Sequence, residues 1–453
     1  MSPEHDIAAL LPRWLPGQRW YAGKGRDIVG VEVVSNVILR AGDPELRHLV
    51  VAVQAADRTA DRYQLLVGLR SDLPDRLAHA AIGTVDGRHA YDAVHDTELT
   101  AVLLDRLAQE ATVDGLRFRT ELDVTLDIAQ SSRVSSAEQS NTSLVFGDVY
   151  ILKLFRRLSE GVNPDLEIHR ALASVGCTHI AAALGAITGA DFTYAMLQGY
   201  VANAADGWHM ATTSVRDLYA EGDLHADEVG GDFAGEAHRL GAATAAVHRD
   251  LAQALGSHEA GPEETRSTAQ QMRDRLAAAL TVVPQLLPFA EGLRAAYDEV
   301  AGLTEPVVVQ RVHGDFHLGQ VLRSMHGWVL LDFEGEPARP FAERTALMSP
   351  LRDVAGMLRS FDYAARHLLA DRAGFAGSVA QPHLLYRANE WAERNRDAFC
   401  AGYAEAAGSD PRRCPALLKA CELDKAVYEA VYETRNRPSW LPIPLDSIAR
   451  LTG

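Results

Sequence analysis

The stretch at residues 310–336 constrains the fold of this chain most strongly. An apolar strand runs into a polar turn, and a second apolar strand at 328–331 follows and ends in acidic residues. The two strand ends carry side chains that can bind a proton or a cation: His313, Asp315, His317, Gln320, Asp332 and Glu334. Phosphoryl transfer needs metal-neutralised phosphates and an aspartate that accepts a proton from the attacking hydroxyl. The stretch therefore predicts a phosphotransferase site.

Each polar residue of this stretch has an expected role. The glycine before Asp315 lets the backbone turn sharply, so we expect this aspartate to reach within about 3 Å of a substrate hydroxyl as its base. Gln320 can offer an amide oxygen to Mg²⁺, and Asp332 is a hard carboxylate suited to a metal that bridges phosphates. Glu334 is expected to join Asp332 directly or through water.

Two rival interpretations of the stretch are weaker. His313 and His317 lie four residues apart and would share a helix face, as zinc ligands do, but Gly314 and the flanking strands oppose a helix. We expect both histidines to brace the loop through hydrogen bonds next to the substrate. A purely structural polar hairpin would explain any one of these residues, but not the whole set.

Composition narrows the class of protein. The chain has 453 residues and a net charge of −17, which disfavours nucleic acid or an anionic membrane as the main partner. No stretch reaches the ~20 apolar residues of a membrane span, and the N-terminus does not have the pattern of a signal peptide. The four cysteines lack metal-ligand spacing, so we expect free thiols in a reducing cytoplasm. The spacing of Cys414 and Cys421 leaves a disulfide open as the alternative.

The residue pattern along the chain predicts an α+β protein. A short helix and β-branched strands at 31–39, 47–55 and 62–69 indicate a β-rich domain over residues 1–90. A second β-rich domain is expected over 91–203, and helical periodicity dominates 204–453. Asp353, near the start of one of these helices, is expected to orient the loop around Asp315 or to cap the helix.

Lys153 lies inside an otherwise apolar strand, the second of a predicted hairpin that turns at Gly147. A buried lysine without a partner is costly. A lysine on a strand that grips nucleotide phosphates and pairs with a helix glutamate meets this requirement, and Glu167, early on the helix after Pro164, is the expected partner. The alternative is an edge-strand lysine that faces water.

Two further segments are candidates for nucleotide contacts. The polar turn at 135–143 contains no glycine, so its backbone amides and its polar side chains would hold the phosphates; these are Ser140, Asn141, Thr142 and Ser143. Gln198 and Tyr200 follow a strand and precede helical sequence, where a hinge would present backbone groups to adenine. An ordinary exit from the strand is the alternative.

The helix expected over 422–437 gives a hint about the acceptor. Asp424, Tyr428, Tyr432 and Arg435 recur at spacings of four, four and three, so they share one face. Aromatic rings beside hydroxyl-binding charges would suit an uncharged sugar. A helix that packs its tyrosines into the core and pairs Asp424 with Arg435 explains the pattern equally well.

The sequence resembles the actinobacterial maltokinases, a protein-kinase-like family related to aminoglycoside phosphotransferases, along essentially its whole length. The resemblance rests on the motifs at 18–23, 137–143, 161–165, 202–208, 214–218, 229–235, 310–320, 332–337, 349–360, 422–429 and 437–444. It implies a bilobal fold with an N-terminal cap domain (1–90), a nucleotide-gripping N-lobe (91–203) and a helical C-lobe (204–453). A monomer is expected, with other enzymes of the α-glucan pathway as partners.

The resemblance also implies a reaction. ATP with Mg²⁺ would phosphorylate the anomeric hydroxyl of maltose, giving maltose 1-phosphate and ADP for glycogen synthesis. Asp315 would be the base, Gln320 and Asp332 would hold Mg²⁺, and Lys153 would contact phosphates. Lys425 joins Asp424, Tyr428 and Tyr432 as an expected sugar contact. Cys421 stands where a tyrosine is usual, which leaves glucose or glucosamine open as the sugar. A nucleotide-binding regulatory module without catalytic activity is the remaining alternative.

Overall fold

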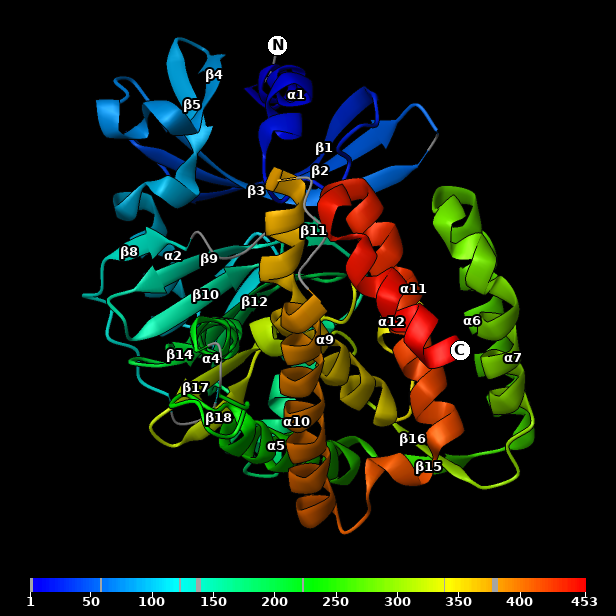
Figure 1. Cartoon of the computed structure of the whole chain (residues 1–453). Coiled ribbons are helices and arrows are strands. Elements are labelled where there is room, and N and C mark those ends of the chain that lie inside the picture. The colour runs from blue at the N-terminus through cyan, green and yellow to red at the C-terminus, as the bar shows by residue number, and fades with distance from the viewer. Residues whose placement is uncertain are drawn as a thin grey trace. The chain divides into compact units, whose positions relative to one another are not determined.

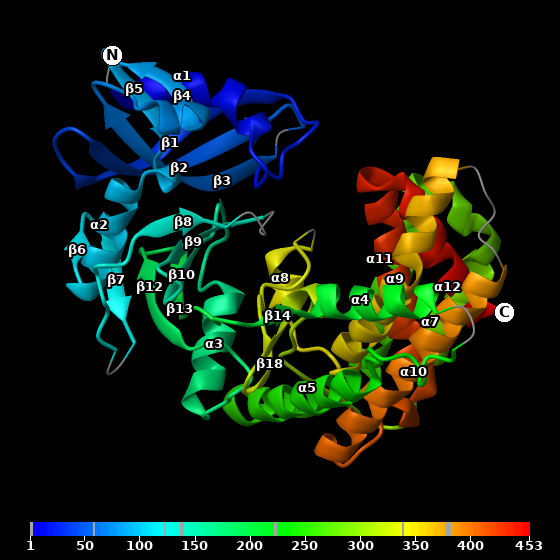
Figure 2. The same ribbon diagram turned by 60° about the vertical axis from the view of Figure 1, so that its left-hand side comes forward.

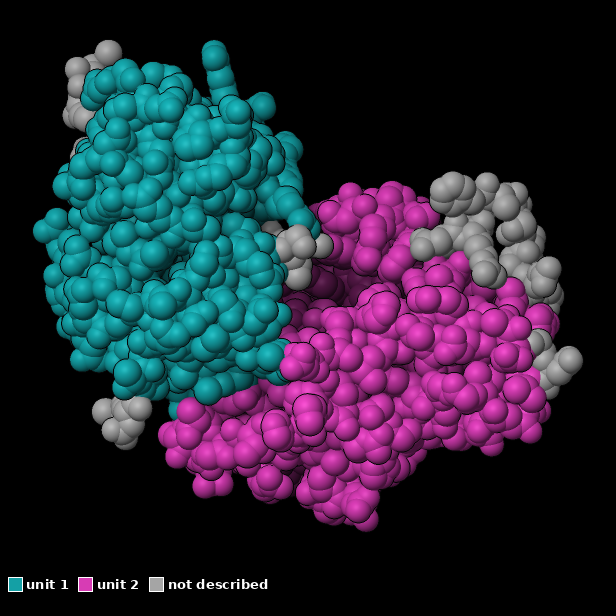
Figure 3. Space-filling model, turned by 90° about the vertical axis from the view of Figure 1, so that its left-hand side faces the viewer, with its two compact units in different colours: residues 1–170, 181–202 teal, residues 171–180, 203–453 magenta. Residues whose placement is uncertain are grey.

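The computed structural model describes residues 3–57, 59–121, 124–135, 140–221, 224–337, 339–376 and 382–453 (Figure 1). The chain forms two compact units, coloured separately in Figure 3. Unit 1 consists of Met1–Arg170 and Ala181–Ala202, and unit 2 of Ala171–Ile180 and Asn203–Gly453. Unit 1 contains two large sheets, whereas unit 2 is mostly helical. This confirms the predicted α+β class with a β-rich N-terminal part and a helical C-terminal part.

The first sheet of unit 1 is antiparallel, in the order β1-β2-β3-β5-β4, with β11 paired to β3. Its strands are β1 (Ile28–Arg40), β2 (Glu45–Ala55), β3 (Ala60–Arg70), β4 (Ala81–Val85), β5 (Arg88–Asp92) and β11 (Arg157–Leu158). Helix α1 (Pro3–Trp14) lies on this sheet (Figure 2). The three strands expected from the β-branched runs are therefore present.

Both faces of the first sheet are buried, because alternate side chains enter different cores. Tyr63, Leu65 and Val67 on β3 pack with residues of α1, such as Ile7. Leu66, between them, packs with α2 and the second sheet. Strands that are apolar on both faces explain why these segments read as nearly continuous hydrophobic runs.

The second sheet has seven strands, in the order β6-β7-β12-β13-β10-β9-β8. They are β6 (Thr112–Val113), β7 (Leu116–Thr120), β8 (Ser132–Val134), β9 (Thr142–Phe146), β10 (Tyr150–Leu154), β12 (Ala183–Thr188) and β13 (Thr193–Gly199). The predicted hairpin is formed by β9 and β10. Helix α2 (Thr97–Ala108) begins at Asp96, whose carboxylate accepts from the Glu98 amide and caps the helix. Helix α3 (Pro164–Ser174) follows β11.

The buried side chain of Arg156 ties the two sheets of unit 1 together. Its guanidinium forms an ion pair of 3.0 Å with Asp92 and donates a 2.8 Å hydrogen bond to Thr142 Oγ1. It also lies 4.7 Å from the ring centre of Trp20, a contact typical of cation–π pairs. Trp20 is thus a buried aromatic anchor. The division of this part into domains at residue 90 stays a prediction.

Unit 2 is built mainly from helices, most of them long (Figure 1). They are α4 (Gly207–Ala220), α5 (Ala234–Leu255), α6 (Pro262–Val282), α7 (Ala290–Ala301), α8 (Phe341–Arg344), α9 (Leu351–Ala376), α10 (Pro382–Ala407), α11 (Pro415–Asn436) and α12 (Pro442–Thr452). Two small sheets accompany them: β14 (Ala205–Asp206), β17 (Val321–Ser324) and β18 (Gly327–Leu330), and β15 (Ser257–Ala260) with β16 (Val307–Gln310). Within the described ranges, no helix has the length and apolarity needed to cross a bilayer. All four cysteines are free thiols.

The loop between β16 and β17 depends on two glycines. Gly314 has a φ of 83°, and a Cβ there would lie 3.3 Å from the Cα of Gly335. Gly356 on α9 supports the loop from behind, because a Cβ at this position would lie 2.5 Å from the carbonyl oxygen of Phe316. The close approach of helix and loop fixes the backbone on either side of Asp315.

Candidate active site

The loop around Asp315 is held by a buried carboxylate on α9. Asp353 accepts hydrogen bonds from the backbone N–H groups of His313 (2.8 Å) and Gly314 (2.9 Å). His248 Nε2 on α5 lies 3.0 Å from Asp353 Oδ2. The predicted orienting role of Asp353 is therefore confirmed. His248 was missed, because nothing in its spacing on the helix identifies a partner in a distant loop.

The two histidines of the loop make local contacts. His313 is 2% exposed; its Nε2 lies 2.8 Å from the Leu331 carbonyl oxygen, and its Nδ1 accepts a long contact of 3.4 Å from the Asp315 N–H. It therefore braces the loop as expected, and a substrate contact of His313 stays a prediction. His317 Nδ1 accepts from the Gly319 N–H at 3.0 Å, and burial lowers the pKa of its imidazole. A substrate contact of His317 stays a prediction.

Asp315 faces a lysine from the far end of the sequence. Lys425 on α11 places its Nζ 2.8 Å from Asp315 Oδ1 and 2.8 Å from Glu336 Oε1. The side chain of Asp315 is 19% exposed, that of Lys425 14% and that of Glu336 1%. One ammonium group thus bridges two carboxylates, of which Asp315 is the more accessible.

The charges of this bridge reinforce one another. Burial by itself would raise the pKa of the Asp315 carboxyl, but the Lys425 ammonium outweighs it and holds the pKa below its usual range. Burial would lower the pKa of Lys425, yet Asp315 and Glu336 together raise it above its usual range. Asp315 is therefore ionised and Lys425 charged at neutral pH, as a proton acceptor and its counter-ion require.

Asp424 serves a different purpose from the one predicted. Its carboxylate is 2% exposed and accepts two hydrogen bonds of 2.9 Å from Arg275 on α6, with Arg352 at 3.4 Å and Arg339 at 3.5 Å. We therefore correct its assignment as a sugar contact: Asp424 links α11 to neighbouring segments. The alternative pairing with Arg435 is also wrong, since Arg435 is exposed and Arg275 takes its place.

The two tyrosines on the same helix remain candidates. Tyr428 is half-buried, its ring centre lies 4.8 Å from Lys425 Nζ, and burial raises the pKa of its hydroxyl. Tyr432, one turn further along α11, is 38% exposed. The placement of Tyr428 beside Lys425 fits a wall next to Asp315. The sugar contacts of both tyrosines stay predictions.

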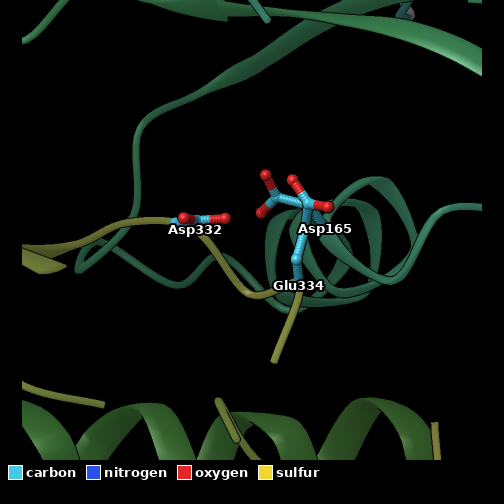
Figure 4. A group of neighbouring side chains, drawn as sticks. All are labelled: Asp165, Asp332 and Glu334. Atoms are coloured by element: carbon cyan, nitrogen blue, oxygen red, sulfur yellow. The ribbon is translucent and has the colours of Figure 1, made fainter. Parts of the chain in front are cut away.

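Oxygen donors cluster at the end of β18 (Figure 4). Carboxylate oxygens of Asp332 and Glu334 lie within 4.8 Å of each other, and Gln320 Nε2 donates a 3.3 Å hydrogen bond to Asp332 Oδ2. Asp332 has a φ of 63°, a backbone conformation that costs energy outside glycine and is concentrated at functional sites. Carboxylate and amide oxygens are the ligands that Mg²⁺ prefers, so the three predicted residues fit this ion.

The lysine of unit 1 has a buried aspartate as a partner. Lys153 Nζ donates a 2.9 Å hydrogen bond to Asp165 Oδ2. Asp165 lies in the first turn of α3 and is labelled in Figure 4. Asp165 and His169 share the buried face of this helix, four residues apart, whereas Glu167 lies to its side and is half-buried. Asp165 is therefore a partner of Lys153 that the sequence analysis did not identify, and the pairing of Lys153 with Glu167 stays a prediction. The i,i+4 spacing of Asp165 and His169 was the signal that could have identified Asp165.

Burial sets the charge of this second pair too. It would raise the pKa of Asp165, but the ammonium of Lys153 and the ring of His169 hold that pKa well below its usual range. His169 Nδ1 lies 2.9 Å from the Asp165 carbonyl oxygen, and its Nε2 lies 2.6 Å from the Gln198 amide nitrogen. Lys153 is therefore bonded to a carboxylate that His169 also holds.

The side chains of two expected nucleotide contacts, Thr142 and Gln198, contact other residues of unit 1. Thr142 bonds to Arg156, because successive strand residues point to opposite faces, so Thr142 lies on the other face from Lys153. Ser143 is the register partner of Lys153 and shares its face. The side chain of Gln198 lies next to His169, and its backbone lies between two neighbouring strands. A contact of its backbone with adenine stays a prediction.

The structure does not test the predicted nucleotide contacts of the other candidates in unit 1. Ser140 is exposed, Asn141 is 7% exposed, and Tyr200 is half-buried, with its N–H bonded to the Val149 carbonyl oxygen. Residues 136–139 of the polar turn lie outside the described part of the chain. Contacts of Ser140, Asn141, Ser143 and Tyr200 with a nucleotide therefore stay predictions.

Several known proteins are similar to this chain. Glucosamine kinase of Streptacidiphilus jiangxiensis is 29% identical over 322 residues, 68% of this chain and 70% of that protein. Glucosamine kinase of Mycolicibacterium smegmatis is 27% identical over 356 residues, 76% of this chain and 85% of that protein. A solved structure of a glucosamine kinase in complex with glucosamine, ADP and inorganic phosphate has the same fold, with a TM-score of 0.70, 23% identity and coverage of 100% of this chain and 99% of that one.

Two family descriptions match the chain itself. Residues 14–96 match the maltokinase N-terminal cap domain, which agrees with the resemblance to maltokinases. Residues 132–417, more than half of the chain, match the phosphotransferase enzyme family. These residues include Lys153, Asp315 and Asp332. The chain therefore belongs to the phosphotransferase enzyme family and carries a maltokinase N-terminal cap domain.

Proposed function

We propose that this protein is an ATP-dependent kinase that phosphorylates the anomeric hydroxyl of maltose and releases maltose 1-phosphate and ADP for glycogen and α-glucan synthesis. The observation that carries the choice of maltose is the match of residues 14–96 to the maltokinase cap domain. Membership of the phosphotransferase family supports the transfer of a phosphoryl group. The four free thiols fit the reducing cytoplasm as its location.

Asp315 acts as the base in this proposal. Its carboxylate accepts the proton of the sugar hydroxyl while that oxygen forms a bond to the γ-phosphorus of ATP and the bond to ADP breaks. The glycine turn at 314 and the two N–H bonds to Asp353 hold the backbone of Asp315 in place. Lys425 keeps the carboxylate ionised between turnovers.

Two further groups hold the nucleotide in this proposal. Asp332, Glu334 and Gln320 bind Mg²⁺, which neutralises phosphate charge during transfer. Lys153 contacts the phosphates, and Asp165 fixes its position. Because each of these residues belongs to a pair or cluster in the structure, their geometry is set before any ligand binds.

A glucosamine kinase is the second candidate, because the relatives described above are named glucosamine kinases. A regulatory module without catalytic activity would not require an accessible carboxylate on a glycine turn. ADP release with ATP, Mg²⁺ and a panel of maltose, glucose and glucosamine separates the three. We expect the highest kcat/KM for maltose. Turnover of glucosamine alone would select the second candidate, and no turnover of any sugar would contradict both kinases.

A further inference from the structure

The bridge formed by Lys425 bears on which sugar can bind. Lys425 Nζ lies at 2.8 Å from both Asp315 and Glu336, the position that an ammonium group of a ligand would need in order to pair with these carboxylates. In the described part of the chain, Asp315 forms its ion pair with Lys425. The protein thus carries its own ammonium group beside the proposed base.

Glu336 does not depend on Lys425 alone. Arg339 donates to Glu336, and Arg352 Nη2 lies 3.3 Å from its Oε2. Both arginines also approach Asp424, so the buried cluster keeps its cations if Lys425 is removed. Asp315, in contrast, would lose the cation that faces it. The charge of Lys425 therefore has its largest effect on Asp315, the accessible carboxylate to which the sugar hydroxyl is proposed to bind.

The space next to Lys425 and Glu336 has little free volume. A cavity of about 10 Å³ adjoins Lys425, and it is lined by Gly314, Phe316, Glu336, Arg352, Gly356 and Cys421. This volume corresponds to about one water molecule. This cavity is therefore too small for a sugar, whose hydroxyl is proposed to approach the exposed part of Asp315.

We propose that Lys425 determines sugar specificity: it excludes sugars with a protonated amino group and admits neutral ones. This inference rests on the proposed function, because it takes the hydroxyl in front of Asp315 to be the anomeric one. The amino group of a 2-amino sugar sits on the neighbouring carbon, so its positive charge would lie close to the Lys425 ammonium. Like charges that cannot separate repel, and such repulsion discriminates between partners that are otherwise equal in shape.

Glucose and glucosamine form the matched test pair, since they differ only in the hydroxyl or ammonium at carbon 2. Their affinities for the full-length protein with Mg-ADP are measured by calorimetry, below and above the pKa of the glucosamine amine. We expect the wild type to bind glucose at least about tenfold more tightly than glucosamine while the amine is charged. The difference should shrink when the amine is neutral.

Three variants separate charge from structure. Lys425→Met removes the cation and should shift the glucose-to-glucosamine affinity ratio about tenfold toward glucosamine at the lower pH. Lys425→Arg keeps the charge and should keep the preference for glucose. Lys419→Met removes a half-buried lysine from the same helix, six residues away, and should leave the ratio unchanged. Thermal melts establish that each variant is folded.

The results that would contradict the role of Lys425 differ from those that would contradict the proposed function. A folded Lys425→Met variant with the wild-type ratio, or a wild type that binds charged glucosamine as tightly as glucose, would overturn the role of Lys425 while leaving the kinase intact. If Lys425→Met does not fold, the pH dependence of the glucose-to-glucosamine affinity ratio in the wild type tests the proposal. A lysine with only a structural role predicts no such pH dependence. Failure of every sugar to bind or turn over would contradict the proposed function itself.

Discussion

The two units each contain a lysine–aspartate pair, and the pairs differ in exposure and in their neighbours. Lys153 and Asp165 in unit 1 have side chains that are 6% and 1% exposed, and Asp165 is held in addition by His169. Lys425 and Asp315 in unit 2 are 14% and 19% exposed, and there it is the lysine that has the extra partner, Glu336. In unit 1, Asp165 fixes the position of Lys153. In unit 2, Lys425 lowers the pKa of Asp315 and so keeps it ionised.

The difference in exposure between the two pairs indicates that Asp315, and not Asp165, is the group that reacts. Asp165 is buried and bound to Lys153 and His169, so we assign it as a positioning residue for Lys153. Asp315 uses one oxygen for Lys425 and lies on a turn that is open enough for a hydroxyl to approach. The predictions below test the two pairs separately, in order of expected effect.

The largest effect is expected from Asp315→Asn. The amide has the shape of the carboxylate but does not accept the proton, so kcat should fall by about 10²–10⁴. Affinity for ATP, measured by titration with a fluorescent analogue, should stay within about twofold. Near-normal turnover in this variant would show that another residue is the base.

The next effect concerns stability and tests the corrected role of Asp424. Asp424→Asn removes the buried partner of Arg275 and should lower the free energy of unfolding by about 3–5 kcal/mol, since an unpaired charge remains in the interior. Urea unfolding monitored by tryptophan fluorescence measures this loss. The KM for the sugar in the folded variant should change little; a large rise in KM with normal stability would restore Asp424 as a sugar contact.

The third effect distinguishes Asp165 from Glu167. Asp165→Asn frees Lys153 from its 2.9 Å partner and should raise the KM for ATP about tenfold or more, because a mispositioned lysine loses its charge-assisted bonds to phosphate. Glu167→Gln, two residues away on the same helix, is the matched control and should change this KM less. The opposite order would favour the pairing with Glu167 predicted from the sequence.

The smallest effect concerns pH. Lys425 holds the pKa of Asp315 below its usual range, so the base is already ionised above about pH 4 in the wild type. Without Lys425, burial acts alone and raises this pKa. In Lys425→Met the acid limb of the kcat/KM profile should therefore move to higher pH, whereas Lys419→Met should keep the wild-type limb. An unchanged limb in a folded Lys425→Met enzyme would contradict the coupling.

The pH dependence of stability has the same sign. A carboxyl whose pKa is depressed in the folded state stabilises the protein above its unfolded pKa, and this contribution disappears as the pH falls through the folded value. Both Asp165 and Asp315 belong to this class. The protein should therefore lose stability on acidification below about pH 4, in melts recorded over a pH series.

Local patterns in the sequence predicted most elements of the fold and the central loop. The β-branched runs became β1 to β3, the hairpin with Lys153 became β9 and β10, and the helix expected over 422–437 is part of α11. The loop motif around Asp315 also placed the expected base and the oxygen donors at strand ends. These features depend on neighbours within a few residues, which periodicity and turn chemistry describe well.

The partners of charged side chains were the part that sequence patterns did not predict. Lys425 meets Asp315 across 110 residues, and Arg275 meets Asp424 across 149. Such contacts arise from the packing of helices, and any of several carboxylates on a helix satisfies the same pattern. The contact between Lys153 and Asp165 was missed for the same reason, since Asp165 and Glu167 lie in one turn and either carboxylate fits the pattern.

The identity of the phosphorylated atom tests the central claim most directly. Wild-type protein is incubated with ATP, Mg²⁺ and maltose, and the product is examined by phosphorus NMR, with Asp315→Asn as the inactive reference. We predict one new phosphate ester whose phosphorus couples to the anomeric proton of maltose, together with loss of the reducing end. A phosphate on any other hydroxyl, or transfer to glucosamine but not to maltose, would contradict the account.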